Sequence, residues 1–357
     1  MPPTTISQNE QLTLYGLTRF PTYNDRQLSE TLKIKMSTVT AIKNRLKRQG
    51  LFQTVRVPYM YPLGCEIVSV CYARLNPLIP HATMVKTMSK VLSELPECVW
   101  AVTDPSNLLA ITVSKNYTDI KRCVEKAFNQ FIEADFLERD TFEMTHYPYG
   151  QSAFFRYFDY APLIRETFGL DFKEPGRPVQ TGLDKIEERH LTRIERKTLL
   201  GLVKYPDLLD NSVAKKIGVT RQSVTKMKKR FETEGLLTSL KVPTVPMLGF
   251  DILLYVRPKF NPQSPIKKKD WQKNILKAYD MSGWVFIAST DLEAGLIVMG
   301  KDYRNIQKNI AVAVATYKKM EFLKEYPDIK FMSLQDTIVL KNHEYTPLLE
   351  KVFADLD

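Results

Sequence analysis

The chain repeats itself at an offset of 185 residues. Residues 10–77 align with residues 195–262 without a gap, and the two segments share 20 identities in 68 positions. Self-similarity at a fixed period is the sequence mark of a repeated architecture. The pairs that we align include Gly16 with Gly201, Gly50 with Gly235, Leu63-Gly64 with Leu248-Gly249, Trp100 with Trp284, and Asp159–Ile164 with Glu344–Leu349. The sequence therefore predicts two copies of one fold in tandem.

The first part of each copy has helical periodicity. In copy one, apolar residues recur at helical spacing in three runs. Pro21 ends the first run, Asp25 begins the second and Gly50 ends the third. A short apolar and basic ribbon follows, at Leu51–Pro58 in copy one and at Leu236–Pro243 in copy two. Three short helices and a hairpin are typical of a winged helix-turn-helix.

The second part of each copy alternates between strand and helix periodicity. The order strand-helix-strand-strand-helix-strand predicts a ferredoxin-like sandwich, an antiparallel sheet with two helices on one face. We expect the two sheets to cover each other's free faces as a pseudo-dimer. The expected elements are Glu66–Arg74, Ala82–Leu95, Val99–Thr103, Leu108–Ser114, Tyr117–Ala134 and Phe136–Tyr147, then Asp251–Val256, Trp271–Met281, Trp284–Ser289, Ala294–Met299, Tyr303–Tyr317 and Ile329–Leu340.

The predicted fold class is α+β, with two tandem copies of a winged helix-turn-helix followed by a ferredoxin-like βαββαβ sandwich. A segment rich in proline and glycine between the copies predicts a linker. The expected domains are a first winged helix-turn-helix at 1–60, a first ferredoxin-like domain with a C-terminal helix at 61–171, a linker at 172–184, a second winged helix-turn-helix at 185–245 and a second ferredoxin-like domain with a C-terminal helix at 246–357.

Composition narrows the function classes. The formal net charge is +11, which favours an acidic partner such as nucleic acid. The 14 glycines include no GxG, so a glycine-rich phosphate loop is not expected. Four cysteines lack CxxC spacing and four histidines form no pair typical of metal ligands, so we predict buried free cysteines, no metal and no cofactor. No apolar run approaches the about 20 residues of a membrane span, and we expect a cytoplasmic protein.

The element order resembles the Lrp/AsnC family of transcription regulators. The resemblance rests on the Gly50 and Gly235 helix stops, the Leu-Gly entry to each sandwich, and the tryptophan-containing hairpin strands. It implies dimerisation through the sandwich and DNA binding through the third helix. It also implies amino-acid sensing near the hairpin between the second and third strands, where the turns read Asp104–Asn107 and Asp291–Ala294.

The outward face of each third helix is the predicted DNA-binding surface. If Val39, Ile42 and Leu46 face the core, the opposite face carries short hydroxyls, amides and cations suited to a major groove. Flanking cations would contact phosphates, with one basic residue in each ribbon near the minor groove. The candidate residues are Ser37, Thr40, Lys43, Asn44, Lys47, Arg48 and Arg56 in copy one, and Arg221, Gln222, Thr225, Lys226, Lys229, Arg230 and Lys241 in copy two.

Two alternative functions remain open. Fused pairs of this kind also resemble siroheme decarboxylases, which share a His- and Arg-rich segment at the hairpin. Here that segment, at Val99–Pro105 and Trp284–Ser289, contains neither residue type. The aromatic stretch Phe154–Tyr160 is compatible with an assembly module that does not bind DNA. We predict a DNA-binding transcription regulator that is not an enzyme, with duplex DNA as partner, a homodimer or intramolecular pseudo-dimer, and an effector left open.

Overall fold

The computed structural model describes residues 5–172, 189–264 and 283–354. Copy one contains helices and strands in the predicted order, followed by a further strand and a helix. Its elements are α1 (Gln8–Arg19), α2 (Asp25–Leu32), α3 (Met36–Arg48), β1 (Phe52–Pro58), β2 (Ile67–Arg74), α4 (His81–Ser93), β3 (Cys98–Asp104), β4 (Asn107–Ser114), α5 (Tyr117–Glu133), β5 (Glu143–Pro148), β6 (Ala153–Arg156) and α6 (Ala161–Thr167).

Copy two follows the same order in the part that the structure describes. The predicted linker, apart from Phe172, and the predicted helix Trp271–Met281 lie outside the described residues. The described elements are α7 (Arg193–Lys204), α8 (Asp210–Ile217), α9 (Arg221–Thr233), β7 (Leu237–Pro243), β8 (Ile252–Arg257), β9 (Trp284–Ser289), β10 (Ala294–Gly300), α12 (Tyr303–Lys319), β11 (Asp328–Ser333), β12 (Ile338–Asn342) and α13 (Thr346–Ala354).

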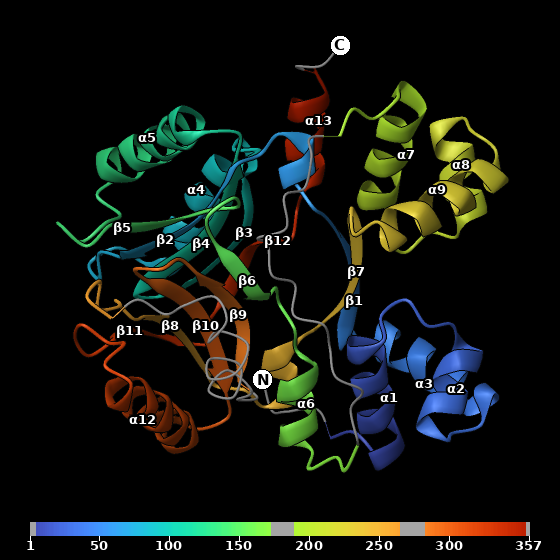
Figure 1. The fold of residues 1–357 in the computed structure, drawn as a ribbon, viewed down its shortest axis with the longest axis horizontal. Coiled ribbons are helices and arrows are strands. Elements are labelled where there is room, and N and C mark those ends of the chain that lie inside the picture. Colours follow the sequence, from blue (N-terminus) through green and yellow to red (C-terminus); the bar gives the residue numbers. More distant parts are fainter. Residues whose placement is uncertain (1–4, 173–188, 265–282, 355–357) are drawn as a thin grey trace. The chain divides into compact units, whose positions relative to one another are not determined.

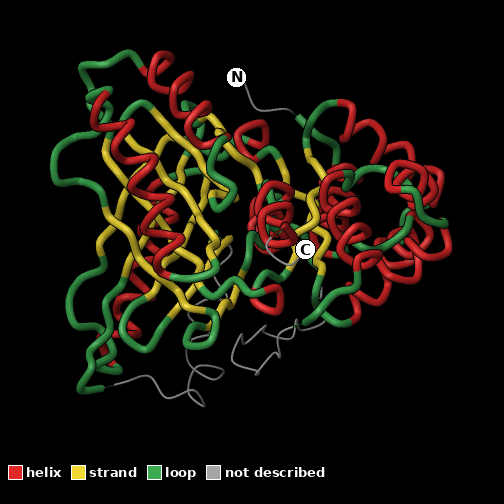
Figure 2. The backbone as a smooth tube through the Cα atoms, turned by 90° about the horizontal axis from the view of Figure 1, so that it is seen from above, coloured by secondary structure: helices red, strands yellow, loops and turns green. Residues whose placement is uncertain are grey.

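Each helix-turn-helix group consists of three helices, α1–α3 or α7–α9, joined by loops; Figure 2 draws helices in red and loops in green. A capping box opens the first helix of each: Glu10 accepts a hydrogen bond from the Ser7 backbone, and Glu195 accepts one from the Thr192 backbone. The third helix ends before a glycine in the left-handed region, Gly50 with φ 70° and Gly235 with φ 71°. The glycine stops are as predicted, whereas the capping boxes were not predicted.

The predicted hairpin wing is absent from each described helix-turn-helix, which corrects the expected architecture. Each copy contributes one strand, and β1 and β7 form a two-stranded sheet. At one end of this sheet Thr244 N donates to Leu51 O at 2.9 Å, and at the other Tyr59 N donates to Leu236 O at 2.8 Å. A two-stranded ribbon still forms, but it takes its strands from segments far apart in sequence.

Both larger sheets have the ferredoxin-like strand order, which confirms the predicted α+β fold class. They run β12-β3-β4-β2-β5 and β11-β8-β10-β9-β6, so each holds four strands of one copy and a fifth strand of the other. In Figure 1 the green strand β6 lies beside the orange strand β9, where Ala153 pairs with Ser289. Strand β12 pairs with β3, with Ile338 opposite Thr103. The copies therefore exchange one edge strand each.

This exchange corrects two expected elements. The strand expected at Ile329–Leu340 is two strands, β11 and β12, which belong to different sheets. The segment Phe154–Tyr160, expected only as an aromatic tail, contributes to strand β6.

The structure divides the chain into two compact units. One combines Met1–Gln53, Gln151–Leu183 and Lys241–Gln335, and the other combines Thr54–Gly150, Asp184–Leu240 and Asp336–Asp357. Each unit therefore joins a helix-turn-helix and C-terminal segment of one copy to the sandwich of the other copy. Pairing of the two sandwiches as a pseudo-dimer stays a prediction.

The core of the first sandwich lies between its sheet and helices α4 and α5, which cover one face of it (Figure 1). Strands β3 and β4 are buried along their whole length, so both of their faces are covered. All four cysteines are free and buried, as predicted. Among the described residues, no helix is long and apolar enough to cross a membrane.

Candidate nucleic-acid interface

Ten of the predicted DNA-binding residues are exposed on helices α3 and α9. Helices α3 and α9 bury Val39, Ile42 and Leu46, and Val224 and Phe231, against their own helix-turn-helix. The opposite faces are open to solvent. The exposed candidates are Ser37, Asn44, Lys47 and Arg48 on α3, and Arg221, Gln222, Thr225, Lys226, Lys229 and Arg230 on α9.

Three candidates, Thr40, Lys43 and Thr225, contact an aspartate at the start of the second helix of their group. Thr40 Oγ1 lies 2.6 Å from Asp25 Oδ2, and Lys43 forms an ion pair with the same carboxylate. In copy two, Thr225 Oγ1 lies 2.8 Å from Asp210 Oδ2. These side chains fix the angle between the second and third helices, and in this arrangement their polar atoms face protein.

Arg230 and Lys241 also have protein partners. Arg230 forms an ion pair with Glu195 of the capping box, as Arg45 does with Glu10 at 2.7 Å. Lys241 lies over the Phe52 ring, with Nζ 6.0 Å from the centroid. Sequence reasoning missed the role of Glu10 and Glu195, although the spacing Ser7 to Glu10 and Thr192 to Glu195 is a capping-box signal.

Arg56, expected on a wing, is buried instead. Arg56 is 5% exposed, and its Nη1 donates a hydrogen bond to Leu202 O at 3.0 Å. Burial lowers the pKa of Arg56, while the charges of Asp210, Glu232 and Asp207 raise it in part. Because β1 is a strand of the shared ribbon, Arg56 serves as an anchor beneath the second helix-turn-helix.

The aspartate contacts have a measurable energetic effect. Burial raises the pKa of Asp25, but hydrogen bonds from Lys43 and Thr40 and the charge of Lys43 outweigh it, so the net pKa is lowered. Asp25→Ala removes these charged hydrogen bonds, and we expect it to lower the free energy of unfolding by about 1 to 2 kcal/mol in urea titrations at neutral pH.

Acid should remove this difference between wild type and Asp25→Ala. A carboxyl whose folded-state pKa is lowered stabilises the fold above its unfolded pKa, and this stabilisation disappears as the pH falls through the folded value. Glu30→Ala is the control, because its pair with Arg26 is 64% exposed on the glutamate side and should contribute little. An equal loss in both variants would contradict the role assigned to Asp25.

Positive charge is concentrated in the helix-turn-helix segments. Residues 1–60 and 185–245 together contain 23 Lys or Arg against 10 Asp or Glu, whereas the rest of the chain contains 28 against 30. The net positive charge of the segments that carry α3 and α9 is therefore larger than the net charge of the whole protein. The sandwiches, with their ends and the linker, are slightly acidic.

The hairpin turns are occupied by internal hydrogen bonds. Asp104 Oδ1 accepts from Ser106 N and from Asn107 Nδ2, both at 2.9 Å, and Tyr72 donates to Asn107 Oδ1 at 2.6 Å. In copy two, Thr290 N donates to Glu293 O at 2.8 Å. These polar groups hold the turns, where the family resemblance implies an effector site.

The histidines have different surroundings. His343 is buried, and burial lowers its pKa to about 3, so its ring is neutral at neutral pH. His146 Nδ1 lies 2.8 Å from Ser69 Oγ, and His81 Nε2 lies 3.4 Å from Thr103 Oγ1. Among the described residues, no group of three or more His, Cys, Asp or Glu is placed to hold a metal ion.

Comparisons with known proteins give the fold over the whole chain. No family model matches the chain, and no curated protein matches its sequence. The siroheme decarboxylase NirDL has a similar solved structure, with 8% sequence identity, coverage of 96% of this chain and 99% of that chain, and a TM-score of 0.51. At this identity the similarity shows a shared fold.

Regulators of the AsnC family match a smaller part of the chain. A transcriptional regulatory protein from Pyrococcus furiosus is 14% identical and covers 40% of this chain and 89% of that chain, with a TM-score of 0.31. AsnC from E. coli is 13% identical and covers 40% and 93%, with a TM-score of 0.30. The likeness to these regulators is therefore partial.

The expectation that the chain is not an enzyme is contradicted. A solved structure that matches nearly the full length is that of a siroheme decarboxylase, an enzyme, so this fold occurs in an enzyme. The sequence argument failed because it excluded catalysis from the absence of one local His- and Arg-rich segment.

Proposed function

We propose that this protein binds duplex DNA through the exposed faces of α3 and α9. The observation that carries the proposal is the concentration of net positive charge in the two helix-turn-helix segments, together with the exposure of their third helices. Duplex DNA is a dense array of phosphates, and lysine or arginine side chains that neutralise them release counterions.

The two faces present different side chains at equivalent positions. Ala41 and Asn44 of α3 correspond to Lys226 and Lys229 of α9 in the repeat. An asparagine pairs well with adenine, whereas lysines contact guanine or phosphate. We infer that the protein reads an asymmetric site with two unlike half-sites rather than a palindrome, as a transcription regulator would.

Replacing Asn44 and Arg48 by alanine tests this inference. We expect the base preference of one half-site to weaken by about tenfold, since a good bidentate contact discriminates by about 1 to 3 kcal/mol, while the other half-site is unchanged. Selection from a randomised duplex pool, followed by sequencing, measures both half-sites at once. Loss of preference in both half-sites would contradict separate reading heads.

A second candidate function is tetrapyrrole decarboxylation. The observation that favours it is the full-length match to siroheme decarboxylase, and along the whole chain this match supports an enzyme better than a regulator.

One pair of titrations separates the two functions. Titration with a mixed-sequence duplex at several salt concentrations should show tight, salt-dependent binding. Titration with siroheme should be followed by absorbance and by release of carbon dioxide. Conversion of siroheme without retention of DNA would overturn the proposal and establish the second candidate.

A further inference from the structure

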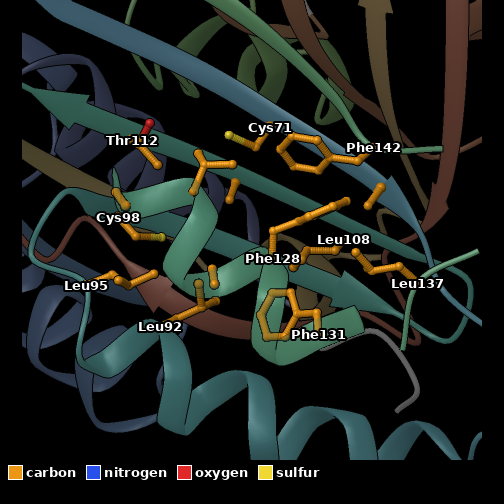
Figure 3. A pocket seen from close by; sticks show the side chains of 15 residues that line it. Cys71, Leu92, Leu95, Cys98, Leu108, Thr112, Phe128, Phe131, Leu137 and Phe142 are labelled. Atoms are coloured by element: carbon orange, nitrogen blue, oxygen red, sulfur yellow. The ribbon is translucent and has the colours of Figure 1, made fainter. Parts of the chain in front are cut away.

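A cavity lies inside the first sandwich, between its sheet and helices α4 and α5. Its volume is about 50 Å³, and its lining is almost entirely apolar (Figure 3). Cys71, Cys98 and Ala110 line it from the sheet, and Phe131 lines it from α5. A cavity of this size exceeds the room that one water needs, yet an apolar cavity stays dry and is suited to an apolar occupant.

The cavity reflects small side chains at helix-facing positions of the sheet. Strand registers identify the equivalent positions, because Cys71 lies opposite Ala110 as Val256 lies opposite Leu296. Cys98 lies opposite Thr112 as Trp284 lies opposite Val298. Copy two therefore has a larger apolar side chain at each position: Val256 for Cys71, Trp284 for Cys98, Leu296 for Ala110 and Val298 for Thr112.

This register also corrects the sequence alignment, which paired Trp284 with Trp100. Trp284 belongs to the apolar core of the second sandwich, whereas its structural counterpart Cys98 belongs to the core of the first. At these core positions the first sandwich therefore has small side chains and the second sandwich has larger ones.

The thiols of the cavity behave as apolar groups. Burial raises the pKa of Cys71 and of Cys98 to about 12, so both are protonated at neutral pH. A protonated buried cysteine packs as a small hydrophobe. With no ionised group facing the cavity from these positions, a charged ligand would lose its hydration without compensation.

The outer side of the cavity is formed by half-buried side chains. Val124, Ala127 and Phe128 of α5 and Phe142, just before β5, line it and are partly exposed. The rings of Phe128 and Phe142 lie 4.9 Å apart between centroids. The cavity therefore approaches solvent between α5 and the start of β5, next to this aromatic pair.

We propose that this cavity binds the end of an unbranched aliphatic chain whose polar head remains at the surface beside Phe128 and Phe142. The volume is about a third of the about 150 Å³ cavity that accepts benzene, so a narrow chain end fits where a ring or a branched group does not. No residue of α3 or α9 lines this cavity, and binding there does not depend on DNA binding.

Two isomeric alcohols test the proposal on the full chain. n-Pentanol and neopentyl alcohol have the same atoms and the same hydroxyl head, but only n-pentanol has an unbranched chain. Titration followed by the methyl NMR signals of Leu108 and Ala110 should give saturable shifts with n-pentanol, and an affinity at least tenfold weaker with neopentyl alcohol. Equal affinities for both isomers, or no saturable shift with n-pentanol, would overturn the proposal.

Filling the cavity provides the matched variants. Ala110→Leu introduces the residue that copy two has at this position, and we expect it to weaken n-pentanol binding at least tenfold, observed through Leu108. Ala110→Val adds less volume and serves if the leucine variant does not fold. Ala315→Leu makes the same change at an exposed position of α12 and should leave binding unchanged. Undiminished binding in the filled variants would place the alcohol elsewhere and refute the site.

Discussion

Replacing Lys226 and Lys229 by alanine should weaken duplex binding by about tenfold at moderate salt and reduce the slope of log affinity against log salt by about 1.8, since each phosphate neutralised contributes about 0.9 to that slope. Both lysines are exposed on α9 and face away from the core of their helix-turn-helix. Fluorescence anisotropy with a labelled mixed-sequence duplex, repeated at four or five salt concentrations, measures affinity and slope together.

The control removes the same charge elsewhere. Lys318 and Lys319 are exposed at the end of α12, on a sandwich helix. Their replacement by alanine changes the net charge equally, so a general electrostatic attraction would weaken in both variants. We expect the α12 variant to keep the slope of the unmodified protein. An unchanged slope in the α9 variant would remove the basis for assigning this face to DNA.

Separating the two halves of the chain should abolish folding of each half alone. Each compact unit contains segments of both halves, because β6 pairs with β9 and β12 pairs with β3. We expect residues 1–172 and 189–357, expressed separately, to aggregate or remain largely unfolded. Expressed together, they should copurify in equal amounts and regain the circular dichroism and thermal midpoint of the intact chain.

An ion pair between the halves provides a graded version of this experiment. Lys351 of α13 pairs with Glu97, whose side chain is 8% exposed. Lys351→Met leaves a largely buried carboxylate without this cation, and such a loss costs about 3 to 5 kcal/mol, so association of the halves should weaken at least tenfold. Adding Glu97→Gln should restore part of the affinity.

The matched control lies within one half. Lys204 pairs with Glu350 at 3.3 Å with both side chains 48% exposed, and Lys204→Met should leave association unchanged because exposed pairs contribute little. A folded, monomeric half, or equal effects of the two lysine substitutions, would contradict the exchange of strands.

The sequence predicted elements whose signals are local. Helical periodicity, the Gly50 and Gly235 stops and the repeat itself located the helix-turn-helix groups, and the alternation of strands and helices gave the sandwich class. Strand pairing could not be predicted, because it joins segments that lie far apart in the sequence. The expected strand Ile329–Leu340 is apolar enough to read as continuous, yet it contains two strands whose partners, β8 and β3, lie in different sheets.

For the predicted DNA-binding surface, too, local spacing predicted exposure but not contacts between elements. Helical periodicity correctly predicted that Ser37, Asn44 and Lys226 face solvent, because burial of a helix face follows from spacing alone. It did not reveal that Thr40 faces Asp25, since that contact spans two helices. The burial of Arg56 depends on the pairing of β1 with β7, which no local pattern encodes.

The exchange of edge strands also fixes when the protein can complete its fold during synthesis. The first sandwich lacks strand β12 and the Lys351 side chain until the ribosome has synthesised these residues, more than 200 residues after β3. Contacts of such long sequence separation form late and slowly, and until then the edge of β3 is open to other chains. Translation through the second copy is therefore the interval in which the edge of β3 stays unpaired.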